Sequence, residues 1–111
     1  MDVMSRQTPG RVLALDIGAR RTGLAISDAT GTLARPLGVI QGGNPIDAVL
    51  ARVAALQAED DGLDAIVVGH PTRLDGRPNE QTARVDALVT VLRSRTPVPV
   101  SLQEGPEISV I

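Results

Sequence analysis

The sequence VLALDIGARRTGLAIS, residues 12–27, decides the fold. Its first apolar run, Val12–Leu15, is closed by Asp16, which predicts a buried strand whose carboxyl end brings a carboxylate to the surface. A second strand is predicted over Thr22–Ser27, after a link of only Gly18–Arg21. So short a link demands an antiparallel hairpin, and it leaves no room for the helix that a plain doubly wound sheet would need here.

The chain after this hairpin changes from strand to helix periodicity. A third apolar stretch, Leu33–Ile40, contains Pro36, which removes a ladder hydrogen bond and favours an edge strand. Apolar residues at helical spacing then predict a helix from about Pro45 to Asp60, with Asn44 as its N-cap. Acidic residues at the end of this predicted helix, up to Asp61, oppose the helix dipole, and the sequence offers no reason for them.

The remaining elements complete a mixed sheet. The run Ala65–Val68 predicts a buried strand parallel to the first and ended by Gly69, and apolar residues at helical spacing from Val85 to Leu92 predict a second helix. Val98–Leu102, with its prolines, suits an edge strand. The order strand, strand, strand, helix, strand, helix, strand is that of an α/β RNase H-like core, a five-stranded sheet with the first strand between the second and the fourth.

Composition indicates one globular domain and limits the possible partners. The 111 residues are 42% hydrophobic and 22% charged. We expect a flexible leader over residues 1–10 and a single domain over residues 11–111. The chain has no Phe, Tyr or Trp to stack unpaired bases, so any nucleic acid must be held through its phosphates. Because the net charge is −2 and every basic residue is Arg, phosphate binding would need a local arginine patch.

Localisation follows from two further features of the sequence. It contains no Cys, and neither a signal peptide nor an apolar run long enough to span a membrane is present. We therefore expect a cytoplasmic protein with no membrane partner, either a monomer or a weak homodimer.

Four segments resemble, in the same order, the YqgF/RuvX family of Holliday-junction-resolvase-like proteins. They are LALDIGARRTGLAISD at 13–28, GTLARPL at 31–37, VVGHP at 67–71, and LDG at 74–76 followed by QT at 81–82. The resemblance covers nearly the whole chain and implies the RNase H-like fold. It also implies a metal-dependent endonuclease of structured nucleic acid, acting in 5′-end processing of pre-16S rRNA or on Holliday-junction-like DNA.

Asp16 is the first candidate catalytic residue. A carboxylate at the end of a central strand can bind Mg²⁺ or Mn²⁺, ions that prefer oxygen ligands and keep waters that substrate phosphates can replace. Two such ions about 4 Å apart activate water and stabilise the leaving oxygen, which requires several converging carboxylates. The alternative is a structural Asp16 that accepts hydrogen bonds from turn amides.

The carboxyl end of the chain departs from the family. The family places further carboxylates in a DER-T motif after the fifth strand and in a final helix. Here Gln103 stands for the Asp, Glu104 matches the Glu and Gly105 stands for the Arg. We expect the domain to be incomplete at its carboxyl end, without the final helix, since Ile111 is the last residue of this sequence. Glu104 is therefore the second candidate catalytic and metal-binding residue, about 10 Å from the first across two strand spacings. With two carboxylates we expect weak Mg²⁺ binding and impaired cleavage.

Four loop arginines are candidate substrate-binding residues because each could neutralise a phosphate. They are Arg20 and Arg21 at the hairpin tip, and Arg73 and Arg77 after the fourth strand. The alternative is that all four are merely solvated. In the same loop region Asp75 is better explained by a turn, and nothing in the sequence supplies an orienting partner for His70.

Two other functions fit parts of the sequence. Asp16 and Gly18, with Gly23, also resemble the phosphate-binding hairpin of sugar kinases and actin-like ATPases, but those enzymes bind nucleotide between two such domains and this chain supplies one. The closer alternative is a catalytically inactive RNase H-like domain that binds nucleic acid or a partner protein. The altered carboxyl-terminal motif favours it.

Overall fold

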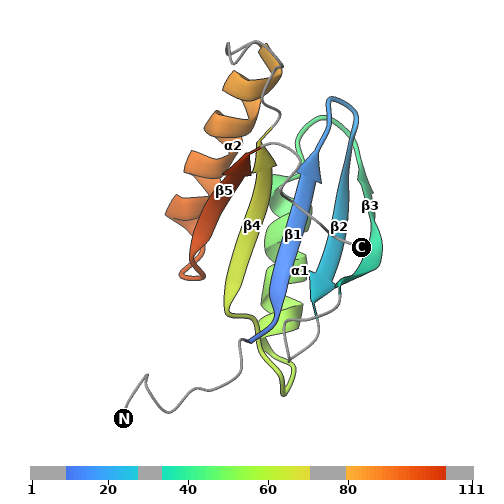
Figure 1. The fold of residues 1–111 in the computed structure, drawn as a ribbon, viewed down its shortest axis with the longest axis vertical. Helices are drawn as coiled ribbons and strands as arrows, with labels where there is room; N and C mark the ends of the chain where they lie inside the picture. Colours follow the sequence, from blue (N-terminus) through green and yellow to red (C-terminus); the bar gives the residue numbers. More distant parts are fainter. Residues whose placement is uncertain (1–9, 28–33, 71–79, 105–111) are drawn as a thin grey trace.

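The structure is a computed structural model that describes residues 10–27, 34–70 and 80–104. A mixed five-stranded sheet lies against two helices, which contact each other (Figure 1). The elements are β1 (Val12–Ile17), β2 (Arg21–Ser27), β3 (Ala34–Gln41), α1 (Ile46–Gln57), β4 (Ala65–His70), α2 (Glu80–Arg95) and β5 (Val100–Glu104). Apart from Gly10, the predicted leader lies outside the described residues. No helix in the described ranges is both long and apolar enough to cross a membrane.

The sheet has the predicted RNase H-like topology. Its strand order is β3-β2-β1-β4-β5, with β1 antiparallel to β2 and parallel to β4. The predicted central position of the first strand is therefore confirmed. Both strands that were expected at an edge because of their prolines, β3 and β5, are edge strands. Pro36 pairs with Ala25 beside an irregularity in the ladder between β2 and β3.

A single hydrophobic core lies between the sheet and both helices. Leu13 and Leu15 of β1 are buried, and they pair in register with the buried residues Ile66 and Val68 of β4. Residues from α1 and α2 belong to the same core cluster, so both helices cover one face of the sheet. Because side chains alternate along a strand, Asp16 belongs to the other face.

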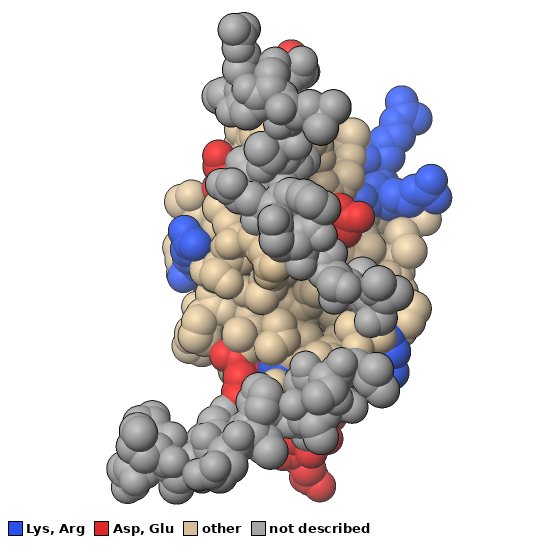
Figure 2. All heavy atoms as spheres, viewed as in Figure 1, with Lys and Arg blue, Asp and Glu red and all other residues tan. Residues whose placement is uncertain are grey.

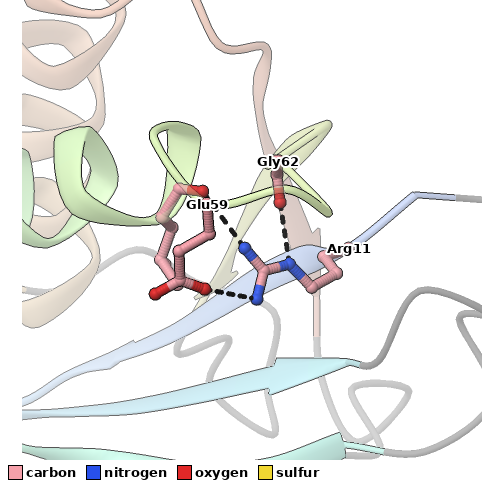
Figure 3. Close-up of polar contacts among 4 residues, drawn as sticks. Arg11, Glu59 and Gly62 are labelled. Atoms are coloured by element: carbon pink, nitrogen blue, oxygen red, sulfur yellow. Dashed lines mark hydrogen bonds and ion pairs between the residues drawn. The ribbon is translucent and has the colours of Figure 1, made fainter.

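The end of α1 differs from the prediction and explains the acidic residues near it. The helix stops at Gln57, so the acidic residues lie beyond its last turn. Arg11 is buried there: its Nη2 donates to the Leu56 carbonyl at 3.1 Å, its Nε to the Gly62 carbonyl at 2.8 Å and its Nη1 to Glu59 at 2.9 Å (Figure 3). Arg11, which directly precedes β1, therefore binds one carbonyl of the last helical turn, that of Leu56, and pairs with one of the acids.

Other boundaries also differ from the predicted ones: β1 extends to Ile17, β2 begins at Arg21 and β3 ends at Gln41. The helix α1 begins at Ile46, one residue later than predicted, and its N-cap is Pro45 rather than Asn44. The Asn44 side chain still accepts a hydrogen bond from the Ile46 amide at 3.1 Å. The strand β4 continues through Gly69 to His70. The fifth strand covers Val100–Glu104, later than the predicted 98–102, because its ladder follows the longer β4.

Candidate functional site

Asp16 stands near the carboxyl end of the central strand, between two glycine positions of the neighbouring strands. It is exposed, as predicted, and lies next to last in β1. Its partner on β2 is Gly23, where even an added Cβ would lie 4.0 Å from the Asp16 Cβ. On the other side Leu15 pairs with Val68, so the next position of the parallel ladder brings Gly69 beside Asp16. A carboxylate flanked by two glycines is accessible to a ligand approaching this face of the sheet.

The register across β4 decides which residue of β5 shares the row of Asp16. Gly69 pairs with Gln103, and His70 with Glu104. The row across the sheet therefore reads Gly23, Asp16, Gly69, Gln103, and its two polar residues are about 10 Å apart, two strand spacings. Glu104 lies one position further along its strand. Within the described ranges no three His, Cys, Asp or Glu residues group as metal ligands, and the metal roles of Asp16 and Glu104 stay predictions.

The turn after Asp16 carries two of the predicted arginines. Arg20 and Arg21 are both exposed, and basic side chains project from the molecule beside the tip of the β1–β2 hairpin (Figure 2). The Gly18 amide donates to the Arg21 carbonyl at 2.8 Å, which closes the turn. A Cβ at Gly18 would lie 2.8 Å from that same carbonyl oxygen, so the turn requires glycine. The structure thus brings Asp16, Arg20 and Arg21 together at one edge of the sheet.

Two residues of α2 hold this turn, and the sequence analysis assigned neither a role. The Gln81 Nε2 donates to the Ile17 carbonyl at 2.7 Å, and the Arg84 Nη1 donates to the Gly18 carbonyl at 2.8 Å. Two signals in the sequence pointed to them: their spacing of three places both on one face of the helix, and Gln81 belongs to the QT pair of the family resemblance.

Other predicted residues are only partly placed. Arg73, Asp75 and Arg77 lie outside the described residues. His70 ends β4 and Glu104 ends β5, so their backbones meet at the carboxyl edge of the sheet. Whether the second arginine pair joins the first therefore stays a prediction.

The comparisons with known proteins agree with this fold and this sequence pattern. The model of the RuvX family, described as Holliday junction resolvase, matches residues 10–105. A Roseiflexus protein named "Putative pre-16S rRNA nuclease" is 40% identical over 92 residues, which cover 83% of this chain and 64% of that protein. A protein of the same name from Chlorobaculum tepidum is 33% identical over 94 residues, covering 85% and 63%. The matched part of the chain thus spans less than two thirds of the length of these relatives.

Two solved structures share the fold at low sequence identity. Archaeoglobus fulgidus Pelota superposes with a TM-score of 0.62 at 11% identity, over 96% of this chain and 30% of that chain. Thermus thermophilus RuvC, solved in complex with a Holliday junction substrate, superposes with a TM-score of 0.54 at 22% identity, over 86% and 64%. These two likenesses support the RNase H-like fold. Since the family model spans nearly the whole chain, including the hairpin that carries Asp16, the chain belongs to the RuvX family of Holliday junction resolvases.

Proposed function

We propose that this chain is the RNase H-like domain of a metal-dependent endonuclease that binds structured nucleic acid in the cytoplasm. The observation that carries the proposal is the meeting of one exposed carboxylate and two exposed arginines at one edge of the sheet. Asp16 would bind the cation, and Arg20 and Arg21 would contact phosphates on either side of the cleavage point. The names of the relatives and of the RuvC complex point to the same class of ligand.

The residues present fit one weakly held ion better than a two-ion centre. Mg²⁺ takes one or two carboxylates plus waters and substrate phosphates, which suits a single exposed Asp16 between glycines. When bound, such an ion would polarise a phosphoryl oxygen and lower the pKa of a coordinated water. Glu104 occupies the strand position after the row of Asp16, on the alternate face of β5, so among the described carboxylates the proposal assigns the ion to Asp16. The chain's own task is to place a phosphate beside Asp16 and to balance its charge with the two arginines.

The substrate proposed is a structured RNA end, as in a 16S rRNA precursor. The chain has no Phe, Tyr or Trp on which unpaired bases could stack, so recognition would run mainly through the phosphates of a folded duplex or junction. Branched DNA presents the same phosphate chemistry, and the experiment below compares the two ligands directly.

A second candidate function is a binding domain that does not cleave. The specific observation in its favour is that neutral Gln103 is the residue of β5 that shares the row of Asp16. A single carboxylate in that row could leave phosphate binding intact while lowering the rate of hydrolysis.

The test compares cleavage and retention of two ligands, a structured rRNA precursor and a four-way DNA junction, with Mg²⁺ or Mn²⁺. Asp16→Asn should abolish cleavage and leave retention at low salt unchanged or stronger, since it removes a negative charge. The double variant R20A/R21A should weaken retention and reduce the slope of log affinity against log salt by about 2. A matched control is R52A/R95A, which removes the same charge from exposed helix positions.

Each outcome separates the alternatives. Cleavage that Asp16→Asn abolishes supports the nuclease, whereas retention without cleavage in the wild-type chain supports the binding domain. Equal effects of R20A/R21A and R52A/R95A on retention would show that the hairpin tip is solvated surface and would overturn the proposed site.

A further inference from the structure

The amino-terminal turns of α2 hold the backbone that directly follows Asp16. Gln81 and Arg84 donate hydrogen bonds of 2.7 and 2.8 Å to the carbonyls of Ile17 and Gly18, which are the next two residues of the chain. Both contacts are partly buried and join residues 64 and 66 positions apart in the sequence. The strand that presents the candidate carboxylate is therefore anchored to the helix at the point where it leaves the sheet.

Arg84 also reaches a third segment. Its Nη2 donates to the carbonyl of Gly43, in the link between β3 and α1. The preceding residue of that link, Gly42, donates its amide to the Arg20 carbonyl at 2.8 Å. A guanidinium is a planar fork of donors, so it can hold two carbonyls at a set spacing. Arg84 thus ties the β1–β2 turn and the β3–α1 link to α2.

These contacts act on the backbone of the residues proposed to bind phosphate. Arg20 and Arg21 are exposed, and their carbonyls accept the hydrogen bonds from the Gly42 and Gly18 amides. If the turn were mobile in the free protein, it would lose conformational entropy on binding, and this loss would lower the affinity for the ligand. A turn that is already held presents its arginines in one arrangement relative to Asp16.

We propose that Arg84, assisted by Gln81, is a positioning residue that fixes the hairpin tip so that Asp16, Arg20 and Arg21 face the same stretch of phosphate backbone. This inference rests on the proposed nucleic-acid function. Arg84 acts through the carbonyls of Gly18 and Gly43 and does not itself contact the ligand.

The decisive experiment is a double-mutant cycle on binding of a four-way DNA junction at low salt, using the full chain. Arg84→Met should weaken binding by about tenfold, because freeing the backbone of one residue corresponds to roughly that factor. In the R20A/R21A background the same substitution should have little further effect. The matched control is Arg93→Met, which removes another α2 arginine that donates to a backbone carbonyl, that of Val100 on β5.

A local measurement separates positioning from general loss of structure. Amide hydrogen exchange at Gly18 and Gly42 should become at least about tenfold faster in Arg84→Met, while Leu15 in the core exchanges at the wild-type rate. Added methylguanidinium should partly restore both the slow exchange and the binding. Arg84→Lys, which retains the charge without the planar fork, should behave like Arg84→Met.

Three results would overturn the proposal. The first is that Arg84→Met weakens binding equally in the wild-type and R20A/R21A backgrounds and lowers the slope of log affinity against log salt by about 1. That result would mean that Arg84 contacts phosphate directly. The second is unchanged glycine exchange, and the third is unfolding of both Arg84 variants, which would make Arg84 a purely structural residue. If R20A/R21A alone leaves binding of both the structured rRNA precursor and the junction unchanged, the proposed function fails instead, and the exchange rates still report whether Arg84 holds the tip.

Discussion

Replacing Arg11 with methionine should destabilise the protein far more than removing the acid that pairs with it. Arg11 is 6% exposed and donates to the carbonyls of Leu56 and Gly62 as well as to Glu59. A hydrogen bond from a charged donor contributes about 1.5–3 kcal/mol, and Arg11→Met removes two of them, so we expect it to lower the free energy of unfolding by about 3 kcal/mol. The Leu56 carbonyl keeps the hydrogen bond from the Glu59 amide at 3.2 Å. The Glu59 side chain is 57% exposed, and an ion pair with so exposed a carboxylate contributes less than about 1 kcal/mol.

Urea denaturation followed by far-UV circular dichroism measures both free energies. The comparison includes Glu59→Gln and, as a control, Arg52→Met at an exposed position of α1, where we expect a change within about 0.5 kcal/mol. The double variant, Arg11→Met with Glu59→Gln, should lose no more unfolding free energy than Arg11→Met alone, because Arg11→Met already removes the ion pair. Equal losses of unfolding free energy in Arg11→Met and Glu59→Gln would refute the conclusion that Arg11 acts mainly on the carbonyls of Leu56 and Gly62.

Three further changes test particular contacts. Thr22→Val should raise the free energy of unfolding by about 1 kcal/mol in a urea titration, because the buried Thr22 Oγ1 has no hydrogen-bond partner among the described residues. A less stable variant would instead show that this hydroxyl has a partner. Gly18→Ala should lower the thermal midpoint, at a cost of about 1–3 kcal/mol, because the new Cβ would crowd the Arg21 carbonyl oxygen; an unchanged midpoint would show that the turn can relax. Val39 on the edge strand β3 is 57% exposed, so Val39→Lys should change the free energy of unfolding by less than about 0.5 kcal/mol. It should also reduce aggregation, measured by light scattering at high protein concentration, because a charge on an edge strand opposes pairing with another chain. More scattering would contradict this account of the edge.

The sequence by itself determined the elements, their order and the position of Asp16. The apolar run before Asp16, the short link to Thr22 and the helical spacing after Asn44 are local signals, and each reflects a period or a turn that spans a few residues. Their succession leaves few topologies, because connections in sheets are short and do not cross. The central strand and the exposed carboxylate at its end could therefore be predicted before any coordinates were known.

Only the tertiary structure decided what these elements do to one another. It placed Arg11 at the end of α1, where its contact to Leu56 joins residues 45 positions apart in the chain. The register of the β1–β4 and β4–β5 ladders placed Gln103 in the same row of the sheet as Asp16. Packing of α2 also brought Arg84 into hydrogen-bond contact with the turn after Asp16. Each outcome depends on register or on packing between distant segments, and a local pattern of residue types carries no information on either.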